Sequence, residues 1–170
     1  MSITALIFLG IAAVAPLPLS LRRVPQWIAP IVSILAVGVA AVTGAATTPL
    51  TGFAMGASAV LAVCAAAFGG LPLAPAAFRI ARRQSDAGEQ TAATGPLQGG
   101  RIIGILERAA VAGAIIAGWP EGMAIVLAVK GLDRYPELRE PRASEQFIIG
   151  TFASVLWAVA VGGIGRGLFT

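Results

Sequence analysis

Residues 27–45 read WIAPIVSILAVGVAAVTGA, a run of 19 residues without a single charge. A helix of about 20 apolar residues crosses the hydrocarbon core of a bilayer. Trp27 opens the run beside the Arg22–Arg23 pair, which is typical of an anchor at the membrane–water interface. The run therefore predicts a transmembrane helix, and it sets the pattern for the rest of the chain.

The composition of the whole chain agrees with that prediction. Of its 170 residues, 57% are hydrophobic and 12% are charged, and the mean hydropathy is +0.86. A soluble domain carries about 25% charged residues, so this chain has too few polar groups to cover a surface in water. The apolar residues are mostly small, which suits close packing of helices in lipid. We expect an all-α, polytopic transmembrane helix bundle.

Apolar runs predict about six short spans, at 3–21, 27–45, 50–73, 102–119, 120–135 and 145–164. Residues 1–78 form a three-span front half, residues 79–101 a flexible cytoplasmic loop, and residues 102–170 a three-span rear half. Pro16 and Pro18 predict a kink or fraying at the end of the first span. The fifth span is short, so it needs local thinning of the bilayer, or Lys130 reaching the interface.

The cations predict the orientation of these spans. With both termini outside, ten of the twelve lysines and arginines fall in the inner loops, as the positive-inside rule favours. These ten are Arg22, Arg23, Arg79, Arg82, Arg83, Arg101, Lys130, Arg134, Arg139 and Arg142; Arg108 lies within a span, and Arg166 lies outside. The sequence therefore predicts a multi-pass protein with its amino and carboxyl ends outside.

Several classes of function are disfavoured by the residues present. The chain has no histidine and one cysteine, Cys64, which excludes an internal disulfide and zinc or haem sites built on those residues. No basic run is interleaved with aromatic residues, so no nucleic-acid partner is expected. Asp86 and Asp133 both fall in loops, so no aspartyl dyad lies in the membrane. We expect no catalytic residue, no metal site, no cofactor and no enzymatic activity.

One charged hairpin is the strongest candidate site. Glu107 and Arg108 lie within the fourth span, where an ionised residue costs about 2.5–3.5 kcal/mol near the span centre. If the hairpin turns between Gly118 and Trp119, residues at equal depth have numbers that add up to about 237, as those of Glu107 and Lys130 do. We expect these two to form an intramembrane ion pair, acting either as a structural salt bridge or as a polar site for an ion, a proton or a partner helix.

Two other contacts are expected around this hairpin. Arg108 points about 100° away from Glu107 on the same helix and could reach phosphate headgroups or another helix. Arg134 lies in the basic linker that follows Lys130, where anionic headgroups sit, and Tyr135 fits the aromatic belt. A simpler alternative is that the linker only determines topology.

The last 70 or so residues resemble a group of small bacterial integral membrane proteins to which no function is attached. The likeness rests on Gly100-Arg101-Ile102-Ile103-Gly104-Ile105-Leu106-Glu107-Arg108, on Lys130-Gly-Leu-Asp-Arg-Tyr-Pro-Glu-Leu, and on Glu145-Gln146-Phe147-Ile148-Ile149-Gly150-Thr151. The group shares a G-R-x-I-G-x-L-E-R opening and an E-x-F-x-I-G-T entry to its last helix. The resemblance singles out Glu107, Arg108, Lys130, Arg134 and Glu145, and it implies a bacterial inner (plasma) membrane.

Two functions fit this sequence. The first is a structural or accessory subunit of a membrane complex, with other membrane subunits or further copies of itself as partners. The alternative is a small oligomeric transporter or channel that uses Glu107 as an intramembrane ion or proton site. The lipid bilayer is the expected surrounding in both cases, with anionic headgroups as a further partner.

Overall fold

The computed structural model describes residues 2–16, 25, 27–46, 48–84, 100–135, 139 and 141–170. These residues form seven α-helices, and no strand occurs among them. The helices are α1 (Ser2–Val14), α3 (Ile28–Ala45), α4 (Gly52–Gly69), α5 (Leu73–Gln84), α6 (Gly100–Ile116), α7 (Glu121–Asp133) and α8 (Pro141–Gly167). The all-α fold predicted from the sequence is confirmed.

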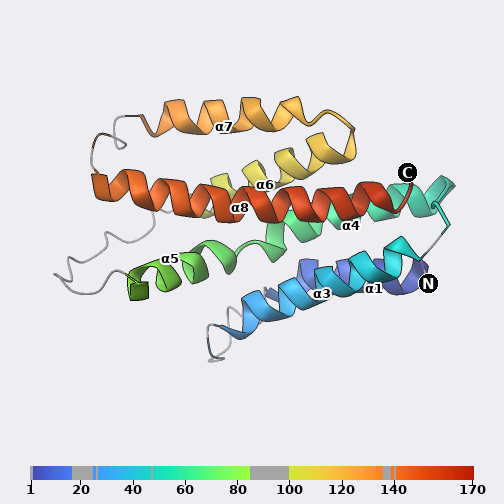
Figure 1. The fold of residues 1–170 in the computed structure, drawn as a ribbon. Coiled ribbons are helices and arrows are strands. Elements are labelled where there is room, and N and C mark those ends of the chain that lie inside the picture. Colours follow the sequence, from blue (N-terminus) through green and yellow to red (C-terminus); the bar gives the residue numbers. More distant parts are fainter. Residues whose placement is uncertain are drawn as a thin grey trace.

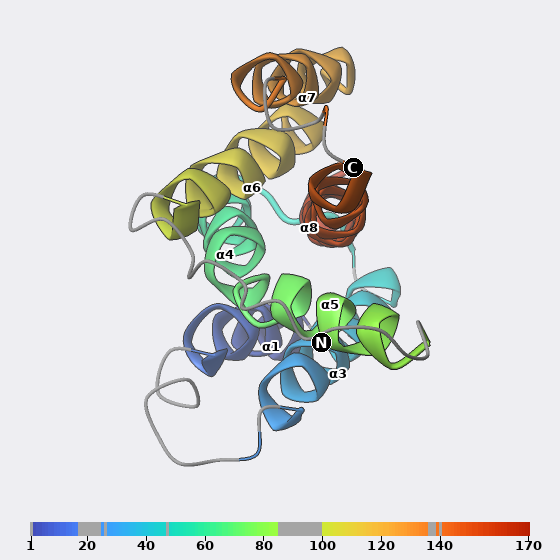
Figure 2. The same ribbon diagram turned by 90° about the vertical axis from the view of Figure 1, so that its left-hand side faces the viewer.

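The helices lie roughly along one long axis, and both termini lie at the same end of the bundle (Figure 1). The longest helix, α8, contacts α3, α4, α5 and α6, so it joins the front and rear parts of the chain. Helix α1 packs on both α3 and α4, and the α1–α3 pair forms one side of the bundle (Figure 2). Helix α7 packs chiefly on α6 at the edge of the bundle, and Gly122 is its one buried residue.

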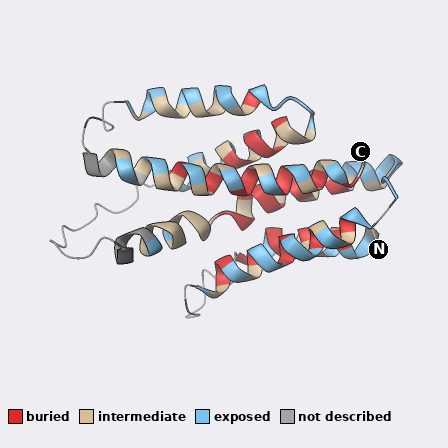
Figure 3. Cartoon of the chain, in the orientation of Figure 1, coloured by how far each residue is buried: buried red, intermediate tan, exposed pale blue. Residues whose placement is uncertain are grey.

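Small side chains allow these helices to approach one another closely. The core consists largely of alanines from α1, α3, α4, α6 and α8, and the outward faces of the helices are exposed (Figure 3). A Cβ added to Gly162 of α8 would lie 3.1 Å from the Cα atom of Ala112 on α6. Because glycine is present there, the two backbones almost touch, and packing of this kind holds helices together in lipid.

Helices α4 and α5 form a bent pair, with an angle of 41° between Phe53–Gly69 and Leu73–Ile80. Pro72 explains the break, because it has no N–H to donate to the carbonyl oxygen of Phe68. The predicted boundary at residues 79–101 is therefore wrong in part. The chain stays helical through Gln84, Gly100 and Arg101 belong to α6, and residues 85–99 of the predicted loop lie outside the described residues.

Helix α5 is amphipathic, which explains why it is ordered despite its charges. Its Phe78 lies against Gly150 of α8, where an added Cβ would stand 2.8 Å from the ring. The Gly-rich end of α8 also stays helical as far as Gly167, beyond the predicted end of the last span at residue 164. Helix α1 ends at Val14; Pro16 is buried beyond it, and Pro18 lies outside the described residues.

Two helices are long and apolar enough to cross a membrane, namely Ile28–Ala45 and the Phe147–Gly167 part of α8. The bent α4–α5 pair makes a third if it is counted as one span. Helices α6 and α7 have 17 and 13 residues, or about 26 and 20 Å, against a hydrocarbon core of about 30 Å. The fold is thus compatible with a membrane protein.

Candidate functional site

Glu107 of α6 and Lys130 of α7 form an ion pair, with Nζ of Lys130 donating to Oε2 of Glu107. Both side chains are largely shielded, at 16% and 21% exposure. The ring centroid of Phe147 on α8 lies 6.0 Å from the same Nζ, within the range of a cation–π contact. The structure thus brings together the two residues that the sequence paired.

The turn between α6 and α7 sets the register that makes this pairing possible. Gly118 has a φ of +75°, a conformation that glycine adopts without steric cost. Trp119 N–H donates to Ala114 O at 2.9 Å, and Gly118 N–H donates to Ile115 O at 3.0 Å. These two bonds form a Schellman motif, which ends α6 sharply and turns the chain back along it.

Arg108 points away from the ion pair and into the bundle, where it is only 5% exposed. Its Nε and Nη2 donate to the carbonyl oxygen of Ala67 at 3.0 and 2.8 Å, and its Nη1 donates to Oγ of Ser154 at 3.3 Å. The expectation that Arg108 reaches headgroups is wrong, because burial keeps its guanidinium inside the protein. The other expectation, contact with another helix, holds for both α4 and α8.

The acceptor on α4 exists because that helix breaks. In an unbroken helix Ala67 O would bond the N–H of Leu71, but Leu71 N–H donates to Phe68 O at 3.1 Å instead. Indole Nε1 of Trp157 lies 3.3 and 3.2 Å from the carbonyl oxygens of Ala65 and Ala66. Arg108 and Trp157 therefore cap the carboxyl end of α4, where a cation also complements the helix dipole. We call Arg108, Trp157 and the three carbonyls of 65–67 the α4 clamp.

Two glycines make room for the α4 clamp. A Cβ added to Gly70 would lie 2.6 Å from Cδ of Arg108 and 2.8 Å from Cδ1 of Trp157. One added to Gly69 would lie 2.7 Å from Cζ2 of Trp157. The Gly69-Gly70 pair is therefore required where the guanidinium and the indole approach the backbone.

Arg166 of α8 forms a second cap, at the carboxyl end of α6. Its Nη1 lies 3.4 and 3.3 Å from the carbonyl oxygens of Ile115 and Ile116. The positive-inside rule marks Arg166 only as a cation on the outer side, and the sequence does not predict this capping role. Within the described part of the chain, every buried side-chain nitrogen or oxygen has a hydrogen-bond partner.

Two cavities flank the Glu107–Lys130 pair. The smaller, about 10 Å³, lies between α6, α7 and α8 against Arg108, Val111, Val126 and Ser154, and it is about the size of one water molecule. The larger, about 70 Å³, lies at the start of α6 and the end of α7. Besides the ion pair, it is lined by Gly100, Ile103, Gly104, Asp133 and Arg134.

The other predicted site residues lie near the same end of the bundle. Arg134 is half-buried and lines the larger cavity. Tyr135 is exposed, and the guanidinium carbon of Arg139 lies 5.7 Å from its ring centroid. Glu145 is exposed on the first turns of α8, and neither it nor Tyr135 lines either of these two cavities. No family model, no curated protein and no solved structure matches the chain.

Proposed function

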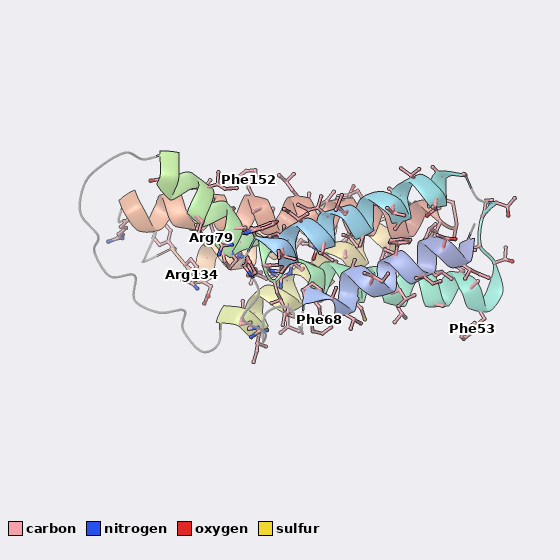
Figure 4. All side chains as sticks on the ribbon, turned by 90° about the horizontal axis from the view of Figure 1, so that it is seen from below. Phe53, Phe68, Arg79, Arg134 and Phe152 are labelled. Atoms are coloured by element: carbon pink, nitrogen blue, oxygen red, sulfur yellow. The ribbon has the colours of Figure 1, made fainter. Side chains whose placement is uncertain are left out.

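We propose that the chain is a multi-pass integral membrane protein of the bacterial inner (plasma) membrane. The observation that carries this proposal is the apolar outer surface of the helices. Large apolar side chains are exposed on every side of the bundle, among them Phe53 at 94%, Val42 at 73% and Leu132 at 74%. Figure 4 shows Phe53 and Phe152 on the outside of the bundle. Lipid is the solvent that such a surface requires.

The proposal includes six crossings with both termini outside. Both termini lie at one end of the bundle (Figure 1), which supports an even number of crossings. Arg79 and Arg134 lie toward the end opposite Phe53 (Figure 4), which supports the arrangement of inner cations that the sequence predicts. The short helices α1, α6 and α7 cross where the bilayer thins around them.

Reporter fusions test this orientation. Alkaline phosphatase joined after Thr170 should be active, because the enzyme folds only outside the inner membrane. A fluorescent protein inserted between Gln84 and Gly100 should be bright, because it folds inside. The reverse pattern would contradict the orientation, and recovery of the protein in the soluble fraction would contradict membrane insertion.

The role that fits the geometry best is a structural or accessory subunit of a membrane complex, without enzymatic activity. The charged groups inside the bundle are used to hold helices together: Arg108 caps α4, Arg166 caps α6, and Lys130 pairs with Glu107. The cavities of about 10 and 70 Å³ are far smaller than the roughly 300–1,000 Å³ of small-molecule sites.

Native purification tests the subunit role. An affinity tag inserted between Gln84 and Gly100 should recover the protein from mild detergent together with a reproducible membrane partner in fixed stoichiometry. A monodisperse preparation of this chain alone would count against the role. A tag fused after Thr170 provides the control, because it lies at the other end of the bundle.

A small oligomeric transporter or channel is the second candidate, with Glu107 as its ion or proton site. The specific observation that favours it is the position of the Glu107–Lys130 pair between two cavities. Flux into liposomes that contain the purified protein tests it, and the Glu107→Gln variant should lose that flux. Equal flux through both proteins would eliminate the candidate.

The exposed polar residues at the same end of the bundle suggest contacts with lipid or a partner. We propose that Arg134 and Tyr135 lie at the level of anionic headgroups, where each cation near the surface contributes about 1 kcal/mol. The exposed side chain of Glu145, on the first turns of α8, contacts a partner subunit in this proposal. The measurement is the amount of anionic lipid that co-purifies with the protein, which should be lower for Arg134→Gln than for the parent protein. Sedimentation with vesicles does not test this contact, because an inserted protein sediments in any case.

A further inference from the structure

The charged hairpin differs from an ordinary dry salt bridge in one respect, namely the space on either side of it. The larger cavity is lined by Gly100, the first residue of α6, and by Arg134, which follows α7. It therefore lies at the end of the helical pair, and Asp133 on its lining is exposed. Glu107 is seven residues further along α6, or about 10 Å deeper.

The lining of this cavity suits water and ions. Glu107 and Asp133 are acids, Lys130 and Arg134 are bases, and Gly104 adds no side chain that would block the space. About 70 Å³ holds several water molecules, since about 10–15 Å³ is enough for one. A charged pair in lipid is stabilised when water can reach it, because the cost of removing an ion from water is then avoided.

The far side of the ion pair is narrow and mostly apolar. The smaller cavity beyond Glu107 and Lys130 is about 10 Å³, and the apolar side chains of Val111, Val126 and Ala158 line it. Arg108 and Ser154 also line this cavity, and their side chains are hydrogen-bonded to each other. The space beyond the ion pair therefore has room for about one water molecule, against several on the side where α6 begins.

We propose that the larger cavity is an aqueous vestibule that opens where α6 begins and α7 ends, and that it delivers water and small inorganic ions to the Glu107–Lys130 pair. Its ligands are of that class and not organic, since about 70 Å³ is well below the roughly 300–1,000 Å³ of small-molecule sites. The inference rests on the membrane insertion proposed above, and the orientation proposed with it places this end of the hairpin on the cytoplasmic side.

The test is the reaction of substituted cysteines with membrane-impermeant thiol reagents in vesicles of defined sidedness. Cys64→Ala removes the native thiol, and Glu107→Cys and Lys130→Cys place single reporters at the end of the vestibule. Leu106→Cys and Val129→Cys are the matched controls, because each is the chain neighbour of a reporter and is exposed on the outer surface. Size-exclusion profiles confirm folding, and Gly104→Cys replaces any reporter that fails to fold.

Both reporters should react about tenfold faster than their neighbours with reagent on the cytoplasmic side, because thiols that face lipid are shielded from it. The charge preference should also reverse between them. In Glu107→Cys the cavity keeps two cations, Lys130 and Arg134, and one anion, Asp133, so it attracts a negatively charged sulfonate reagent. In Lys130→Cys it keeps two anions, Glu107 and Asp133, and one cation, Arg134, so it attracts a positively charged trimethylammonium reagent. A loosely packed interior would not produce this reversal.

Three outcomes separate the vestibule from the proposed function. Reporters that react no faster than their controls, from either side, overturn the vestibule. Fast reaction of the reporters from the outer side alone upholds the vestibule and overturns the proposed orientation. Fast reaction of Leu106→Cys and Val129→Cys as well overturns both the vestibule and membrane insertion, because those side chains would then lie in water.

Discussion

Arg108 of α6 donates two hydrogen bonds to one oxygen, the carbonyl of Ala67, at the point where α4 breaks. A broken helix inside a membrane leaves carbonyl groups that no water can satisfy, and each costs several kcal/mol unless a donor is found. A buried arginine has the complementary requirement, since its five N–H donors need acceptors. Each group meets the requirement of the other, so the break and the buried charge are one feature of the fold.

Replacing Arg108 by methionine should destabilise the protein substantially. The variant leaves Ala67 O without its donor, and hydrogen bonds that involve a charged group contribute about 1.5–3 kcal/mol each. The measurement is the thermal midpoint of unfolding in detergent. Ser154→Ala, which removes only the acceptor of Nη1, should lower the midpoint less. An unchanged midpoint for Arg108→Met would contradict the role of the α4 clamp.

The Glu107–Lys130 pair should show strong coupling. Glu107→Gln alone leaves the ammonium of Lys130 without its counter-charge in a part-buried position, which destabilises the protein by less than the cost of breaking a fully buried pair, about 3–5 kcal/mol. The double variant Glu107→Gln with Lys130→Met removes both charges and should be more stable than Glu107→Gln. Melting curves of the single and double variants complete the cycle. Identical midpoints for the two would mean that the pairing contributes nothing.

Gly70→Ala should destabilise the bundle, because the new Cβ would lie 2.6 Å from Arg108 and 2.8 Å from Trp157. Overpacking of this kind typically costs about 1–3 kcal/mol. Gly113→Ala is the matched control, since Gly113 has no atom within 4 Å of an added Cβ and lies within α6. The control should melt at or above the temperature of the parent protein. Equal behaviour of the two alanine variants would argue against close packing at Gly70.

Gly118→Ala should weaken the hairpin for two reasons. The φ of +75° costs an alanine about 1–2 kcal/mol, and the new Cβ would collide with the guanidinium of Arg166. Comparing Arg166→Ala alone with Arg166→Ala combined with Gly118→Ala isolates the backbone cost, because both variants lack the α6 cap and neither has the collision. Limited proteolysis at the α6–α7 turn provides the readout. If Gly118→Ala resisted proteolysis as well as the parent protein, the turn would not require glycine at position 118.

The parts of the fold that the sequence predicts well are those with one dominant signal. The uncharged run at 27–45 coincides with α3 to within a residue, because nothing in it competes with helix formation. The Glu107–Lys130 pairing follows from hairpin register alone, since a sharp turn at Gly118 fixes which residues share a depth.

The parts that it misses depend on contacts between distant helices. The charges of 79–84 favour a loop by composition, but Phe78 packs on Gly150 and the chain stays helical. The glycines near the end of α8 would weaken a helix in water, yet Gly162 lies against Ala112 and gains close packing in exchange.

Arg108 illustrates the same limit within the site. Its direction relative to Glu107 follows from helix geometry, but its acceptors lie 41 and 46 residues away along the chain. The Gly69-Gly70-Leu71-Pro72 stretch within an apolar run is the signal that could have predicted a break with unsatisfied carbonyls. Which donor satisfies them depends on the order of the helices in the bundle, and no local pattern encodes that order.

The location of the donors has a consequence for biosynthesis. The break after α4 emerges from the ribosome before Arg108, and both of these emerge before Trp157 and Arg166 of α8. When α4 and α6 have been synthesised, Trp157 and Arg166 are therefore not yet present at their carboxyl ends. Synthesis of α8 supplies the last donor to both caps, Trp157 for α4 and Arg166 for α6, so both helix ends depend on the same late segment of the chain.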